Sequence, residues 1–202
     1  MKPLHFSGEY LERAVLGNGI PVAVRLVRPS DATLLVRGFE RLSVSSRYCR
    51  FFGYKKILSP AEVRYFTHCD GMDHFALGAA VERADGDEEG VGIARFVRQA
   101  GNPLAAEAAV TVVDDFQRIG LGRLLFNRLL GAAAERGVDE LRSLVLAENK
   151  PMLAFLSKLG SEVKHGIDPQ FGARAIKFVV PVSAPKPCAN AKLGAKSQSE
   201  AR

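Results

Sequence analysis

Alternating and helical hydrophobic patterns divide the chain into short elements of both kinds. Residues 21–29, read PVAVRLVRP, alternate apolar and basic side chains, as a strand with one exposed face does. Further apolar runs predict strands at 75–81, 91–97, 107–113, 141–146 and 174–180. Apolar residues at helical spacing predict helices at 31–42, 46–52, 120–136 and 150–158, and another helix begins at Pro60 after Ser59. Strands that alternate with helices in this order predict an α/β fold with a mixed sheet.

The most informative stretch is 110–128, read VTVVDDFQRIGLGRLLFNR. A β-branched run stops at two acids, and a loop with Gly120 and Gly122 leads directly into the predicted helix. The first N–H groups of a helix have no intrahelical acceptor and lie at the positive end of its dipole, so they stabilise an anion. Glycines allow close approach of that anion to the backbone. The stretch therefore predicts a phosphate site.

The spacing of the loop narrows the choice of phosphate ligand. A Walker loop needs Gly-Lys-Ser/Thr and a dinucleotide fingerprint needs a third glycine near Leu125, and both are missing. The remaining pattern, Gln/Arg-x-x-Gly-x-Gly after a strand, resembles the acyl-CoA pyrophosphate loop of the GNAT superfamily of N-acetyltransferases. A plain strand-to-helix turn is the alternative for the glycine pair alone. The resemblance implies that the pyrophosphate is held by Gln117, Arg118, Ile119, Gly120, Leu121, Gly122 and Arg123, mostly through main-chain N–H groups.

A second resemblance extends over most of the chain. The runs ERLSVSSRYCRFFGYKKILSPAEVRYFTHCDGMDHFALGA, VTVVDDFQRIGLGRLL and LAENKPMLAFLSKLG resemble the acetyltransferase domain of bacterial protein lysine acetyltransferases. It implies a GNAT fold, a twisted mixed sheet of six to seven strands with helices on both faces. We expect an N-terminal extension at 1–20, the acetyltransferase domain at 21–181 and a disordered basic tail at 182–202.

The chemistry of amine acetylation needs a base, because an alkyl amine with a pKa of about 10.4 is protonated near neutral pH. Glu107 is the lone acid in an apolar strand, and the resemblance places a catalytic glutamate on this strand. Burial would raise the pKa of its carboxyl toward the working range. A solvent-exposed glutamate at the strand entry is the alternative. The resemblance also implies that a backbone N–H at Val112 or Val113 meets the thioester carbonyl.

Two residues near the next predicted helix complete the implied site. The resemblance places the Asn149 side chain against the pantetheine arm, and a helix N-cap is a compatible alternative role. Seven residues on, many GNAT enzymes have a tyrosine that protonates the departing thiolate, but this chain has Leu156. Water, or unassisted release of a thiolate with a pKa of about 8.5, then takes the place of a general acid.

Composition excludes several other classes of protein. The formal charge is +6 for 202 residues, but the stretch after Pro181 holds four basic residues and one acid, so the charge gives little support to nucleic-acid binding. Three cysteines and four scattered histidines lack metal-ligand spacing, so we expect no metal. No apolar run approaches the roughly 20 residues of a membrane span. We expect a cytoplasmic monomer or homodimer.

The sequence therefore predicts acetyl transfer from acetyl-CoA to a primary amine by direct attack, with a protein lysine as the favoured acceptor. A small-molecule amine (polyamine, amino acid or antibiotic) is an alternative acceptor. A weakly catalytic acyl-CoA-binding regulator is a third possibility, which Leu156 favours.

Overall fold

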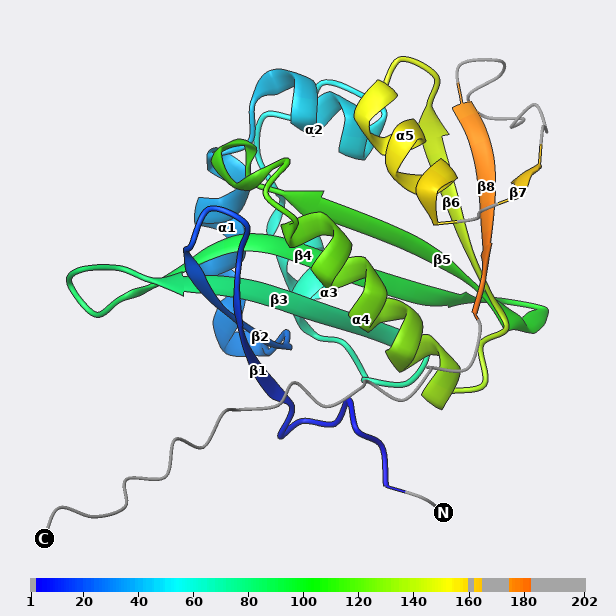
Figure 1. Cartoon of the computed structure of the whole chain (residues 1–202), viewed down its shortest axis with the longest axis horizontal. Helices are drawn as coiled ribbons and strands as arrows, with labels where there is room; N and C mark the ends of the chain where they lie inside the picture. Colours follow the sequence, from blue (N-terminus) through cyan, green and yellow to red (C-terminus); the bar gives the residue numbers. More distant parts are fainter. Residues whose placement is uncertain (1–2, 160–161, 165–174, 183–202) are drawn as a thin grey trace, which may run out of the picture.

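A single sheet organises the described part of the chain. The computed structural model describes residues 3–159, 162–164 and 175–182, so the predicted tail beyond 182 lies outside it. Within these residues eight strands form a sheet in the order β1-β2-β3-β4-β5-β6-β8-β7 (Figure 1). Their bounds are β1 Leu11–Val15, β2 Pro21–Leu26, β3 His74–Glu82, β4 Glu88–Gln99, β5 Asn102–Val112, β6 Glu140–Leu146, β7 Glu162–Lys164 and β8 Ala175–Pro181.

Helices cover both faces of this sheet, as predicted. Figure 1 shows α4 and α5 on one face and α1 and α3 on the other. The five helices of the described residues are α1 Ala32–Glu40, α2 Val44–Phe51, α3 Pro60–Thr67, α4 Leu121–Glu135 and α5 Lys150–Lys158. The rings of Phe126 on α4 and Phe155 on α5 meet edge to face at 5.5 Å. The predicted α/β fold with a mixed sheet is confirmed.

Three local features refine the expected elements. The stretch 1–20, expected to be an extension, contributes β1, and the sheet has eight strands instead of the six to seven predicted. The expected break between the first two helices is short, because Ser43 caps α2 by accepting the Ser46 N–H. The predicted start at Pro60 is confirmed, and Ser59 and Glu62 form a capping box there.

The main core lies between the sheet and α4. Phe75, Leu77 and Phe96 on this face of the strands are fully buried, and the rings of Phe75 and Phe96 stack at 5.4 Å. Leu121, Leu125 and Leu129 lie on one face of α4 and are also fully buried. Hydrophobic burial at the helical period thus fixes the position of α4 against β3, β4 and β5.

The sheet divides between β5 and β6. This parallel pair has only three register partners, the last being Glu107 and Arg142, although β5 continues to Val112 and β6 to Leu146. Over the rest of their lengths β5 is paired with β4 and β6 is paired with β8. Figure 1 shows β5 and β6 diverging, with the first turn of α4 beyond the end of β5 and α5 after β6. The backbone edges of two strands are therefore exposed toward each other.

Leu125 provides a test of the α4 core. Leu125→Ala removes a fully buried side chain, and we expect it to lower the free energy of unfolding by about 2–5 kcal/mol. The matched Leu104→Ala variant changes a side chain that is 53% exposed and should cost less than about 1 kcal/mol. Urea denaturation of both variants measures the difference. Equal losses would mean that α4 does not pack as described.

Candidate active site

The divergence of β5 and β6 leaves a row of backbone groups on β5 without a strand partner. The Val113 N–H donates to the Val91 carbonyl at 3.0 Å, which fixes the alternation of the β4–β5 ladder. Even-numbered residues of β5 consequently direct their N–H and C=O groups toward β6. Two side-chain bonds agree with this assignment, because the Ala108 carbonyl accepts the Ser143 hydroxyl and the Val112 carbonyl accepts the Gln117 amide.

This alternation separates the two backbone candidates for the thioester. The N–H of Val113 is already used within the sheet, so the structure does not support a role for Val113 in binding a ligand. The N–H of Val112 faces the opening. Val110 faces it too, and lies three residues from Glu107, about 10 Å along the strand, whereas Val112 lies about 17 Å away. The sequence pattern alone did not identify Val110.

The predicted phosphate loop has the backbone of an anion site. A 3-10 turn at Asp114–Phe116 leads to Arg118, with φ of 61°, and Gly120, with φ of 96°. Gly120 is the N-cap of α4 and supplies no side-chain cap, and the first helical bond runs from the Leu124 N–H to the Gly120 carbonyl. The N–H groups of Leu121, Gly122 and Arg123 therefore have no intrahelical acceptor.

Contacts from two distant segments hold this loop in place. The Gly17 N–H donates to the Ile119 carbonyl at 3.1 Å. Because C=O and N–H point in opposite directions across a trans peptide, this bond turns the Gly120 N–H away from the β1–β2 hairpin. The amide of Gln117 donates to the Ser46 hydroxyl and the Val112 carbonyl, so its side chain braces the loop. The Gly17 contact was not predicted, since no local pattern signals it.

Asp114 connects the start of the loop to α2. Its carboxylate accepts hydrogen bonds from the Ser43 N–H and from the hydroxyls of Ser43 and Ser46. Burial alone would raise the pKa of the Asp114 carboxyl, but these hydrogen bonds outweigh it and lower the pKa. The acid is thus ionised near neutral pH and holds the start of the loop against α2.

Arg118 and Arg123 are exposed and form no ion pair with described residues, so both are available to an anion.

Asn149 lies at the opposite side of the opening, where α5 begins. Its side-chain oxygen accepts the Met152 N–H at 3.2 Å, so the N-cap role is confirmed. The amino group of the same amide forms no hydrogen bond with the described residues and can still donate to a ligand. Leu156, by contrast, is fully buried, so a residue at this position of α5 faces the core.

Glu107 differs from the expectation of a buried carboxyl. It is exposed, on the sheet face that carries α1 and α3, and it pairs in register with Val97 of β4. The buried neighbours Ala106 and Ala108 point to the opposite face, so an apolar sequence around Glu107 did not imply an apolar environment. Any base function must therefore operate in contact with solvent.

No group of three or more His, Cys, Asp and Glu side chains that could hold a metal is found among the described residues. In the same part of the chain, every helix is too short or too polar to cross a membrane.

Comparison with known proteins decides which phosphate ligand suits this site. The sequence model of the acetyltransferase (GNAT) family matches residues 43–160, which include the divergent strands and the loop. The chain belongs to the GNAT acetyltransferase family. Membership makes it an acyl-CoA-dependent acetyltransferase, and the unpaired amides of α4 suit the diphosphate of the coenzyme.

Three relatives support the assignment. An acetyltransferase of Pseudomonas aeruginosa is 32% identical over 72% of this chain and 77% of its own length. The acetyltransferase Pat of Mycolicibacterium smegmatis is 33% identical over 70% of this chain, but the match spans only 44% of that protein. The crystal structure of the GNAT domain of S. lividans PAT has a TM-score of 0.77 at 26% identity, covering 90% of this chain and 99% of the domain.

Gly120→Ala tests the loop of this GNAT acetyltransferase. An added Cβ would meet nothing within 4 Å, but an alanine strains the left-handed backbone and shifts the following amides. We expect acyl-CoA affinity to fall about tenfold, measured by isothermal titration calorimetry. Gly86→Ala is the matched control, because Gly86 has φ of 84° and equally open surroundings in the β3–β4 turn. It should cost similar stability and leave affinity unchanged, and the account fails if both variants bind acyl-CoA alike.

Proposed function

We propose that the protein transfers an acetyl group from acetyl-CoA to a primary amine, with a protein lysine as the favoured acceptor. The observation that carries the proposal is the meeting of two sets of unpaired backbone groups. The free amides at the start of α4 lie beyond the end of β5, whose own backbone faces the opening toward β6. One extended ligand with a diphosphate at one end and amides along its length satisfies both sets.

In this arrangement the diphosphate of acetyl-CoA binds the N–H groups of Leu121, Gly122 and Arg123. The pantetheine arm then lies along the exposed edge of β5, where the Val112 N–H meets one of its amide oxygens. The Asn149 amino group reaches the arm from the other side of the opening. We place the thioester carbonyl at the Val110 N–H, because Val110 is nearer to Glu107 and its N–H stabilises the developing oxyanion.

The reaction removes two protons from the acceptor ammonium and exchanges the carbon–sulfur bond for a carbon–nitrogen bond. The carboxylate of Glu107 accepts a proton from the acceptor ammonium. A water molecule relays this proton, because Glu107 lies too far from the thioester for direct contact with the attacking nitrogen. The free nitrogen attacks the acetyl carbon and then loses its second proton to water. The tetrahedral intermediate collapses to the amide with cleavage of the carbon–sulfur bond. The exposure of Glu107 lets the proton pass to solvent after each turnover.

The departing thiolate takes no proton from position 156 of α5. Leu156 lies in the core and carries no proton, so the thiolate leaves as the anion or takes a proton from water. A thiol with a pKa of about 8.5 makes this feasible. The acetylated amide, free CoA and the protons passed to solvent then account for all atoms of the substrates.

An exposed base favours a large acceptor. Glu107 lies at an accessible part of its sheet face, where a lysine on another protein can reach it without being enclosed. A polyamine, amino acid or antibiotic remains the alternative acceptor. Release of free CoA with a lysine-containing protein mixture, compared with single small amines, separates these two acceptor classes.

Glu107→Gln tests the proposed base. We expect kcat/KM at pH 7 to fall about 100-fold or more while acetyl-CoA affinity stays unchanged. Without a base, the rate follows the fraction of free amine and rises about tenfold per pH unit toward the amine pKa of about 10.4, so the deficit shrinks at alkaline pH.

Glu82→Gln is the matched control, because Glu82 is an exposed glutamate at the end of β3, away from the opening. It should retain the wild-type rate. An unchanged pH–rate profile in Glu107→Gln would remove Glu107 from the mechanism, and binding of acetyl-CoA without release of CoA by any amine would contradict catalysis.

A further inference from the structure

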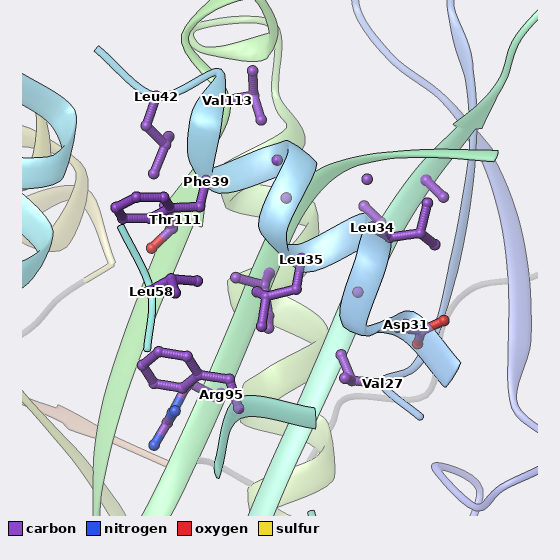
Figure 2. Close-up of a pocket in the computed structure, with 18 of the residues that line it drawn as sticks. Val27, Asp31, Leu34, Leu35, Phe39, Leu42, Leu58, Arg95, Thr111 and Val113 are labelled. Atoms are coloured by element: carbon purple, nitrogen blue, oxygen red, sulfur yellow. The ribbon is translucent and has the colours of Figure 1, made fainter. Parts of the chain in front are cut away.

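A cavity lies on the other face of the sheet, beneath α1. Figure 2 shows its apolar walls, with Leu34, Leu35 and Phe39 of α1 on one side and Leu58 on another. Gly78 and Gly90 present no side chain to it from the sheet, and an added Cβ would meet Val27 at Gly78 and the Leu34 carbonyl of α1 at Gly90. The cavity therefore has room and hydrocarbon surface for the body of a small apolar molecule.

Three arginines line this cavity, and they differ in their partners. Arg25 forms an ion pair with Asp31 at 2.7 Å and another with Glu88. Arg95 and Arg50 form no ion pair with any described residue. Figure 2 places Arg95 at the far end of the cavity from Leu42 and Val113. The cavity is thus largely apolar, with the positive charges of Arg95 and Arg50 not neutralised by an ion pair.

Arg95 is the more buried of the two. Only 8% of its surface is exposed, and its Nη1 atom is fully buried without a hydrogen-bond partner. Its guanidinium contacts the rings of Tyr65 and Phe66, whose centroids lie 4.6 and 4.7 Å from Cζ. Ring faces attract the cation but do not accept in the plane of its N–H groups. A buried donor left in this state is costly, and an anion would satisfy it.

The pKa of the Arg50 guanidinium reflects the positive charge of its surroundings. Burial first, and then the charge of Arg95, lower the pKa of the Arg50 guanidinium to about 10, while the carboxylate of Glu107 opposes them. Burial and Arg95 likewise lower the pKa of His74, so this side chain is neutral near pH 7. Arg50 and Arg95 thus repel each other, and the negative charge of Glu107 acting on Arg50 offsets this repulsion only in part, so one more negative charge would be favourable.

We propose that this cavity binds a small carboxylate with a hydrocarbon body. Its carboxylate lies against Arg95 and Arg50, and its hydrocarbon part lies against α1. A guanidinium presents paired N–H donors that match the two oxygens of a carboxylate. A single negative charge suits the site, because the walls offer few further donors to a phosphate dianion. This binding does not require acyl transfer, so it stands apart from the proposed function.

Such a carboxylate can come from two sources. A free acid would bind as an effector or inhibitor beside Arg50, whose charge interacts with that of Glu107. An amine-bearing acid would bind as an acceptor, with its nitrogen toward Glu107. Isothermal titration calorimetry with hexanoate, norleucine and 1-hexanol, in the absence of any coenzyme, separates these sources and tests the charge requirement.

We expect a carboxylate probe to bind with a measurable dissociation constant and 1-hexanol to bind at least tenfold more weakly. Stronger binding of hexanoate identifies a free acid, and stronger binding of norleucine identifies an amine-bearing acid. Arg95→Gln and Arg50→Gln should each weaken the preferred probe about tenfold or more, because each loses a charged hydrogen bond. Arg95→Lys should retain part of the affinity.

Arg13→Gln is the matched control, since Arg13 is an exposed arginine on β1. Thermal unfolding followed by circular dichroism establishes that each variant is folded. The proposal is overturned by absence of heat with both carboxylates at millimolar concentration, by equal binding of 1-hexanol, or by unchanged affinity in both folded Gln variants. Since no coenzyme is present, failure here is distinct from failure of acetyl transfer.

Discussion

The early end of the β5–β6 ladder is the constraint on which the site depends. Hydrogen bonding holds β5 to β4 and β6 to β8, so the two strands separate once their three register partners are used. At the point of separation the Ser143 hydroxyl donates to the Ala108 carbonyl at 3.0 Å. This bond satisfies one exposed acceptor and the Gln117 amide satisfies the Val112 carbonyl, whereas the N–H groups of Val110 and Val112 stay available. A sheet that remained paired here would have no room for an extended ligand.

The phosphate loop, residues 117–123, depends on contacts from segments distant in the sequence. Positive φ angles at Arg118 and Gly120 are unfavourable for most residues, and they persist only where surrounding contacts impose them. The Gly17 bond to Ile119 and the bracing by Gln117 supply those contacts from opposite sides. The hairpin between β1 and β2, although outside residues 43–160 that the family model matches, therefore helps to hold the loop backbone in place.

Much of this arrangement could be predicted from the sequence. The period of the apolar residues located α4, α5 and the central strands closely, because burial at a regular spacing leaves a clear signal. The unpaired amides of the loop followed from two glycines at a helix start. The exposure of Glu107 could not be predicted, because its apolar neighbours point to the other face of the sheet. The hydrogen bond from the Val113 N–H to the Val91 carbonyl could not be predicted either, since strand pairing is set by residues far away in sequence.

The cavity beneath α1 shows a different limit of sequence analysis. Arg50 and Arg95 belong to separate elements, and nothing in their local sequence indicates that both lack an acidic partner. Only the packing of α1, α2 and α3 over the sheet brings them to one space. The sheet face beneath α1 thus combines apolar walls with guanidinium groups that have no ion-pair partner among the described residues.

The most direct test of the account is hydrogen exchange of individual backbone amides, followed by NMR with and without acetyl-CoA. If the coenzyme bridges the divergent strands and the start of α4, the amides of Val110, Val112, Leu121, Gly122 and Arg123 exchange more slowly on binding. The amide of Val113, already bonded within the sheet, changes little. Binding of acetyl-CoA that leaves the exchange of Leu121, Gly122 and Arg123 unchanged would contradict the central claim.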